Sequence, residues 1–86
     1  MAEPRRTFLV DAAAGPDLLV RVLGPFALIE AEVTDIRLER REERVSLAIE
    51  TVDLGEIRSE RIAGRLRALP SVRSVGMAWR SGAISS

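Results

Sequence analysis

The sequence predicts an α+β fold in which two helices cover one face of a four-stranded antiparallel sheet. Three observations lead to this prediction. Four segments show the alternating or wholly apolar pattern of strands, and two segments carry an apolar stripe at helical spacing. The segments follow one another in the order strand, helix, strand, strand, helix, strand. This βαββαβ order places both helices on the same side of the sheet.

Length and end composition predict one domain, residues 1–86. The polar ends, residues 1–5 and 81–86, are expected to be flexible. A domain of this size buries only about 60–65% of the surface that its unfolded chain exposes. We therefore expect the fold to need a partner or a second copy.

Composition excludes several classes of function. The chain has no cysteine and no histidine, so it lacks disulfides, thiolate or imidazole metal ligands and the usual catalytic nucleophile and base. We expect no enzymatic activity, no cofactor and no metal. Its 13 basic and 13 acidic residues balance, which argues against binding to nucleic acid. No apolar run approaches the roughly 20 residues of a membrane span, and a signal peptide is not recognisable, so we expect a cytoplasmic protein.

The first strand is predicted at about Arg6–Ala12, with the apolar run Thr7–Val10 in a buried central position. Three alanines then lead into Gly15-Pro16-Asp17. Glycine tolerates a turn, proline presets the first helical φ, and an acidic residue complements the helix dipole, so a helix should begin near Pro16. Exposed amides at such a helix start can receive a carboxylate or phosphate. This loop is the candidate ligand site, although an ordinary strand-to-helix turn would have the same pattern.

The first helix should reach about Leu28, with a kink at Gly24-Pro25. Its predicted buried stripe is Leu18, Leu19, Val22, Leu23, Phe26 and Ile29.

The side chains of Ala31–Arg41 alternate in polarity, which predicts a half-buried strand. One face would carry Thr34, Ile36 and Leu38, and the other Val33, Asp35, Arg37 and Glu39. The charged row is typical of an edge strand. Such charges either prevent indiscriminate pairing with other strands or select one specific partner. Arg41–Arg44 then predicts a hairpin turn whose type stays open.

The third strand is predicted at Val45–Val52, with Val45, Leu47, Ile49 and Thr51 on one face. A second helix should span Glu56–Leu69 with the stripe Ile62, Ala63, Leu66 and Leu69, and Pro70 should stop it. The last strand, Ser71–Arg80, should place Val72, Ser74, Gly76 and Ala78 on one face and Val75, Met77 and Trp79 on the other.

This order of elements is that of the ferredoxin-like fold, which supports many functions. An RNA-binding member would carry stacking aromatic residues on its third strand, and Val45–Val52 has none. A metal-carrying member would have cysteines in its first loop. An acylphosphatase-like member would have a glycine-rich first loop followed by arginine, whereas Ala12–Asp17 has one glycine and no arginine.

One family fits better. The run Pro16–Leu23 resembles the start of the first helix in ACT domains, especially those of the short acetolactate synthase (acetohydroxyacid synthase) regulatory small subunits. The run Arg21–Phe26 is similar to that family's arginine, two aliphatic residues, glycine and phenylalanine, with Pro25 as a departure. The resemblance is diffuse and covers about residues 6–80.

The resemblance implies a non-catalytic regulatory subunit that activates or stabilises the acetolactate synthase catalytic subunit, which itself carries thiamine diphosphate. It also implies a homodimer joined through the edge strand Ala31–Glu39. The effector would bind between Ala14, Gly15, Pro16, Asp17 and Leu18 of one chain and Val33, Thr34, Asp35 and Ile36 of the other. The alternative is a stand-alone ACT-like sensor of an amino acid or other small molecule, acting on another partner.

The first loop departs from the pattern of amino-acid-binding ACT domains, which carry asparagine, two further residues and glycine. Those positions here hold Ala14 and Asp17. The amide side chain is absent, and the carboxylate of Asp17 is expected to repel the carboxylate of an amino acid.

Overall fold

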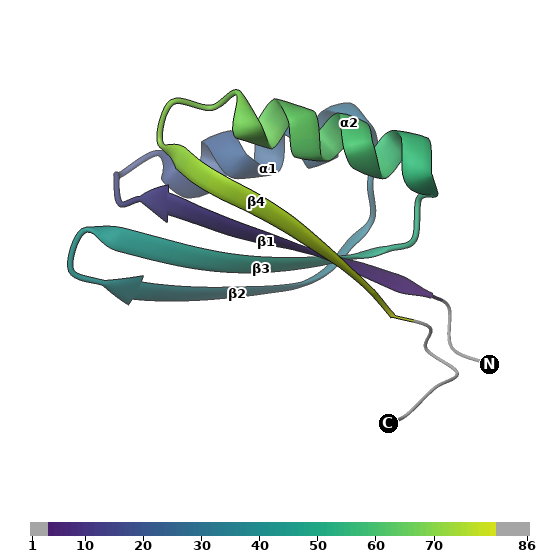
Figure 1. Ribbon diagram of the computed structural model, residues 1–86, viewed down its shortest axis with the longest axis horizontal. Coiled ribbons are helices and arrows are strands. Elements are labelled where there is room, and N and C mark those ends of the chain that lie inside the picture. Colours follow the sequence, from purple (N-terminus) through teal and green to yellow (C-terminus); the bar gives the residue numbers. More distant parts are fainter. Residues whose placement is uncertain (1–3, 81–86) are drawn as a thin grey trace.

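The computed structural model describes residues 4–80, with side chains described as far as Ala78. The elements are β1 (Arg5–Ala13), α1 (Leu18–Leu28), β2 (Val33–Arg41), β3 (Arg44–Val52), α2 (Glu56–Arg67) and β4 (Val72–Arg80). The sheet order is β2-β3-β1-β4, every neighbouring pair is antiparallel, and both helices lie on one face (Figure 1). The predicted ferredoxin-like α+β fold is confirmed. Among the described residues, neither helix is long and apolar enough to cross a membrane.

The chain ends differ slightly from expectation. Arg5, which the sequence assigned to a flexible end, opens β1. The carbonyl oxygen of Pro4 accepts a hydrogen bond of 3.0 Å from the amide of Asp53. The remaining positions predicted to be flexible, residues 1–3 and 81–86, lie outside the described residues.

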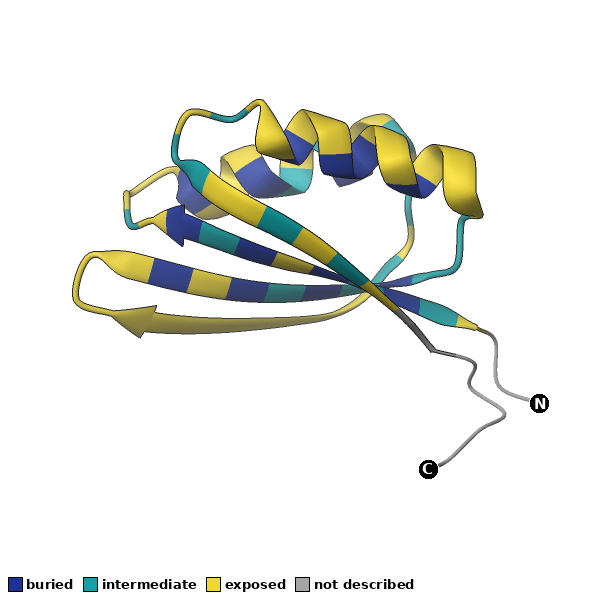
Figure 2. Ribbon diagram, in the orientation of Figure 1, coloured by how far each residue is buried: buried dark blue, intermediate teal, exposed yellow. Residues whose placement is uncertain are grey.

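The hydrophobic core lies between the sheet and the helices. On β1 and β3, every second side chain points toward the helices and is buried: Phe8, Val10 and Ala12 lie beside Ile49, Leu47 and Val45 (Figure 2). From the helices, the core receives Leu18, Val22, Phe26, Ile62, Ala63 and Leu66. The rings of Phe8 and Phe26 meet edge to face, 5.1 Å apart and at 88°. This contact attaches α1 to the central strand β1.

The first helix is shorter at its start than predicted. Pro16 and Asp17 form a turn, and α1 begins at Leu18. It ends at Leu28 as predicted, with Pro25 inside it. Leu19 is 39% exposed, so its predicted burial is wrong. The fully buried positions of α1 are spaced four residues apart, and a neighbouring position is turned by about 100° away from that narrow stripe.

The prediction that β2 is half-buried is wrong. Beyond Val33, every residue of β2 is exposed, because the strand lies at the edge of the sheet beyond the cover of the helices (Figure 2). A break in register between Val33 and Asp35 also moves Val33 to the core side, where the sequence had placed Thr34. The predicted charged edge is thus present, but its apolar row is uncovered: Ile36 is 39% exposed and Leu38 49%.

A second irregularity corrects the last strand. Its register against β1 shifts between Asp11 and Ala12, so Val72 packs on the core with Val75 and Met77 rather than sharing a face with Ser74. The helix α2 ends at Arg67, two residues before the predicted end.

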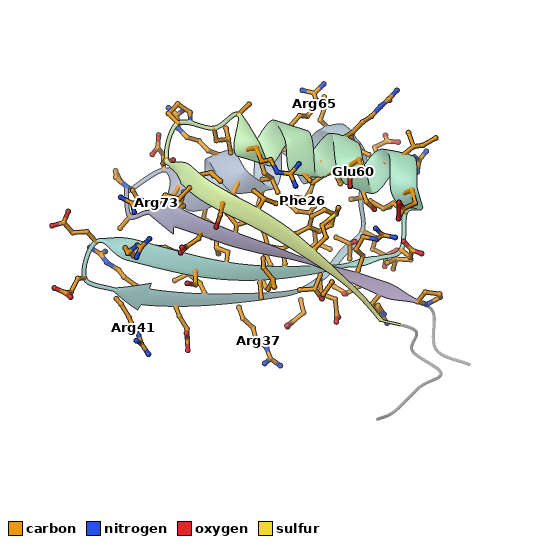
Figure 3. All side chains as sticks on the ribbon, in the orientation of Figure 1. Phe26, Arg37, Arg41, Glu60, Arg65 and Arg73 are labelled. Atoms are coloured by element: carbon orange, nitrogen blue, oxygen red, sulfur yellow. The ribbon has the colours of Figure 1, made fainter. Side chains whose placement is uncertain are left out.

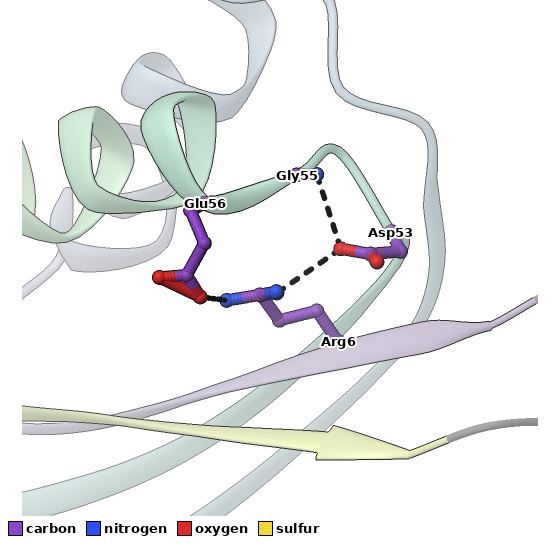
Figure 4. Close-up of polar contacts among 4 residues, drawn as sticks. All are labelled: Arg6, Asp53, Gly55 and Glu56. Carbon is purple, nitrogen blue, oxygen red and sulfur yellow. Dashed lines mark hydrogen bonds and ion pairs between the residues drawn. The ribbon is translucent and has the colours of Figure 1, made fainter.

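A buried arginine connects three elements. Arg6 points to the helix side of β1 and is only 8% exposed. Its Nε donates to Oδ1 of Asp53 at 3.2 Å, and the same oxygen accepts from the amide of Gly55 at 3.1 Å. The Nη1 atom lies 3.6 Å from Oε1 of Glu56 (Figure 4). Gly55 has a φ of 87°, a conformation that favours glycine. These contacts hold the start of α2 against β1.

Candidate functional site

The first loop is anchored by backbone hydrogen bonds at one end of the sheet. The amide of Ala13 donates to the carbonyl of Ser71 at 2.8 Å, and the amide of Ala14 donates to the carbonyl of Glu43 at 2.8 Å. The loop therefore lies between the β2–β3 turn and the start of β4. Its position is set by strand pairing rather than by its own side chains.

Within this loop, the predicted site residues differ in accessibility. Gly15, Pro16 and Asp17 are exposed, and Ala14 is partly buried. Leu18 is buried in the core, so it supports the loop from beneath. The exposed surface available to a ligand is thus the short segment that precedes α1.

Asp17 is paired with Arg21 one helical turn later. The Nε atom of Arg21 donates to Oδ2 of Asp17 at 2.6 Å, and the Asp17 side chain makes no capping hydrogen bond to the helix. The hydrogen bond from Arg21 lowers the pKa of the Asp17 carboxyl below its ordinary value of about 3.8. The loop therefore presents an ion pair at neutral pH rather than the isolated carboxylate expected from the sequence. The four-residue spacing was the signal that could have identified this partner.

The second half of the predicted site lies at the other end of the same sheet. Val33 faces Thr51 and Asp35 faces Glu50, whereas Ala13, at the start of the first loop, faces Arg44. Nine residues of extended strand separate the two ends by roughly 26 Å. The structure thus does not bring Ala14–Leu18 and Val33–Ile36 together within one chain.

At that far end, the four predicted site residues 33–36 differ in hydrogen bonding and in exposure. The hydroxyl of Thr34 donates to the carbonyl oxygen of Glu50 at 3.2 Å and lies 3.1 Å from its Oε1. Asp35 and Ile36 are exposed, and Val33 is partly buried against the core. This end of β2 presents both a carboxylate and an apolar side chain to the outside.

The open face of the sheet, away from the helices, carries a shallow hollow of about 610 Å³. Leu9 lies between Ala48 and Gly76 there, and β2 contributes Arg37 and Glu39 to the border. Figure 3 shows Arg37 and Arg41 projecting from β2 away from the helices. None of the predicted loop residues lines this hollow. The hollow could have been predicted from the small residues at alternate positions of the third and last strands, which are Ser46, Ala48, Ser74 and Gly76.

Comparison with solved structures finds the same fold in several proteins. The ACT domain of GTP pyrophosphokinase from Chlorobium tepidum superposes with a TM-score of 0.76 at 9% identity, over 86% of this chain and 96% of that one. The C-terminal domain of MgtC from Mycobacterium tuberculosis gives 0.74 at 16% identity, over 98% and 95%. The regulatory subunit of aspartate kinase from Thermus thermophilus, in its ligand-free form, gives 0.68 at 14% identity, over 88% of this chain and 50% of that one.

Sequence comparison adds the family. A comparison with curated proteins finds no match. The family model described as ACT-like domain matches residues 2–81, which include every element of the sheet and both helices. The chain therefore belongs to the ACT-like domain family.

Proposed function

We propose that this chain is a non-catalytic regulatory module that works as a homodimer joined through the β2 edge, about residues 31–39. The observation that carries the proposal is the separation of the two halves of the predicted site. β2 is an uncovered edge strand, so a second β2 can extend the sheet. In an antiparallel pair of such edges, Val33–Ile36 of one chain comes to the end where the other chain holds its first loop. The effector site then forms only in the dimer.

The chemistry of the loop favours a zwitterionic amino acid as the effector. The pair of Asp17 and Arg21 offers a carboxylate for an ammonium group and a guanidinium for a carboxylate. The pairing also weakens the repulsion that an isolated Asp17 would exert on the effector's carboxylate. Exposed Ile36 of the partner supplies an apolar contact for an aliphatic side chain.

The proposed target is the catalytic subunit of acetolactate synthase, with a role in branched-chain amino acid biosynthesis. This target rests on the resemblance of Pro16–Phe26 to the short regulatory small subunits. Regulation would be a coupling free energy, in which the effector favours one of two states of the complex. The diversity of the similar structures, which include domains of GTP pyrophosphokinase and MgtC, supports the alternative of an ACT-like sensor acting on another partner.

The test is the activity of the acetolactate synthase catalytic subunit from the same organism, with and without the purified chain, and then with valine, leucine or isoleucine added. We expect activity to rise with the chain and to change with the amino acid. Asp17→Asn should remove the amino-acid response, and Glu60→Gln, on the exposed surface of α2, should leave it unchanged.

Thermal unfolding of the isolated chain with each amino acid separates the two candidates. A ligand that binds only the folded state raises the unfolding temperature. Stabilisation by a ligand without any effect on the synthase would favour the stand-alone sensor. No change in activity and no co-purification would contradict the synthase assignment.

A further inference from the structure

The exposed side chains of β2 alternate in charge on the open face of the sheet, in the order Asp35, Arg37, Glu39 and Arg41. We propose that β2 pairs with β2 of a second copy in one register, with Leu38 on the two-fold axis facing the partner's Leu38. This inference rests on the proposed homodimer and specifies its geometry. The partner is a second copy of this chain, selected by charge complementarity along the edge.

Pleating restricts the possible registers. Ile36, Leu38 and Arg40 face Ile49, Leu47 and Val45 across the β2–β3 ladder, so they point to the helix side. The residues between them point to the open face. When two edges join with both helix layers on one side, open-face side chains must face open-face side chains. One residue of β2 must therefore lie at the two-fold axis, directly opposite its own copy in the partner. Each candidate register is named after that residue.

The Leu38 register is favoured by charge. It places Asp35 opposite the partner's Arg41 and Arg37 opposite the partner's Glu39, and symmetry repeats both pairs. The Arg37 register would instead place Arg37 opposite itself and Asp35 opposite the partner's Glu39. The Glu39 register would place Glu39 opposite itself and Arg37 opposite the partner's Arg41. Like charges directly opposite each other destabilise a strand pair, so both neighbouring registers are disfavoured, as is the Arg40 register, which would place Arg40 opposite itself.

The Ile36 register is charge-compatible only in part. It would pair Asp35 with the partner's Arg37, but it would also place Glu39 opposite the partner's Val33. Its overlap includes the break in register between Val33 and Asp35, which disrupts a regular ladder. The Leu38 register uses residues 35–41, which contain no such break.

The chain's own β2–β3 ladder supports the same choice. On the open face Asp35 faces Glu50, and at the other end Arg41 faces Arg44. Each end of β2 thus places two like charges opposite each other, while Oδ2 of Asp35 also lies 3.4 Å from Nε of Arg37 and Nη2 of Arg44 lies 3.6 Å from Oδ2 of Asp11. The two-fold axis through Leu38 places the acidic end of one chain beside the basic end of the other. On the helix side, the same axis covers Leu38 with its own copy.

The register also determines which residues of the partner reach the end of the sheet that holds the first loop. The partner's Asp35 faces Arg41, and the partner's Ile36 faces Arg40. The adjacent turn residue Glu43 accepts the hydrogen bond from Ala14. The register thus brings the partner's residues 33–36 to the end of the sheet that holds the first loop.

Disulfide cross-linking of single-cysteine variants tests the register directly, because the chain contains no native cysteine. A disulfide requires Cα atoms about 4.4–6.8 Å apart, so only the residue on the axis can link to its own copy. We expect Leu38→Cys to form a covalent dimer on mild oxidation, with Ile36→Cys, Arg37→Cys and Glu39→Cys remaining unlinked. Linking at one of those three positions instead of 38 would overturn the inference.

Charge reversal provides an independent readout in the dimer dissociation constant, measured by sedimentation equilibrium. Arg37→Glu and Glu39→Arg should each weaken the dimer about tenfold, and the double variant should restore it, because the swapped charges again face each other. Arg65→Glu, which makes the same charge change on the exposed face of α2, should leave the constant unchanged.

The outcomes separate this inference from the proposed function. A stronger dimer for Glu39→Arg would indicate the Arg37 register, and a stronger dimer for Arg37→Glu would indicate the Glu39 register. Either result overturns the inference and leaves the homodimer intact. A wild-type chain that stays monomeric at high concentration would overturn both the register and the proposed edge pairing.

Discussion

Two glutamates occupy left-handed backbone conformations: Glu30 has a φ of 60° and Glu42 a φ of 55°. Glu30 follows the end of α1, where its amide donates to the carbonyl of Ala27 and the amide of Ala31 donates to that of Phe26. These two bonds form a Schellman motif, whose left-handed position is most often glycine. A side chain with a Cβ is strained there.

Glu30→Gly is therefore expected to raise the free energy of unfolding by about 0.5–1 kcal/mol, since it relieves the strain but enlarges the freedom of the unfolded chain. The matched control Glu30→Ala removes the same charge and keeps the Cβ, so it should give no such gain. Urea denaturation measures both. A glycine variant no more stable than the alanine variant would contradict this explanation.

The ion pair at the first loop predicts a pH effect. Because the pKa of Asp17 is lowered in the folded state, its pairing with Arg21 stabilises the fold above about pH 3.8. That contribution is lost as the pH falls through the lowered pKa. In Arg21→Met, the Asp17 carboxyl should titrate closer to its ordinary value.

Carboxyl chemical shifts followed by NMR during a pH titration would report this change. Arg65→Met on α2 is the control and should leave the titration of Asp17 unchanged. An unchanged Asp17 titration in Arg21→Met would exclude the hydrogen bond as the cause.

At the scale of elements, the contacts of Arg6 connect β1, the β3–α2 loop and the first turn of α2. The Asp53 side chain is central, because its Oδ1 accepts from both Arg6 and the Gly55 amide. Asp53 is partly buried and Glu56 is exposed, with side-chain exposures of 24% and 82%. Burial makes an ion pair sensitive to loss of one partner, whereas exposed pairs contribute little.

Asp53→Ala is expected to lower the free energy of unfolding by about 2–3 kcal/mol, because Arg6 then remains buried without its main acceptor. Glu56→Gln should change it by less than about 0.5 kcal/mol. Equilibrium urea unfolding of the two variants makes the comparison. Equal losses would mean that the buried ion pair is not what holds this junction.

At the scale of the whole molecule, two helices cover only part of a four-stranded sheet. β2 is left uncovered, with Ile36 and Leu38 exposed on its helix side. A small domain has little reserve of buried apolar surface, so covering this edge in a dimer would add to its stability.

The midpoint of thermal unfolding should therefore rise with protein concentration, because association favours the folded state by mass action. Scanning calorimetry over a concentration range of about 100-fold would measure the dependence. Arg37→Glu should weaken it, since it weakens the proposed dimer. A midpoint independent of concentration would indicate that the isolated chain supplies all the stability.

Features that depend on local periodicity could be predicted from the sequence alone. The alternation in Val45–Val52 and the stripe of Ile62, Ala63 and Leu66 placed β3, α2 and their buried faces, because each pattern reflects neighbours within one element. The tertiary structure decided what depends on distant residues: the exposure of β2, the two shifts in strand register, and the distance between Ala14–Leu18 and Val33–Ile36. Those features follow from the order of strands in the sheet, which brings together residues far apart in the chain.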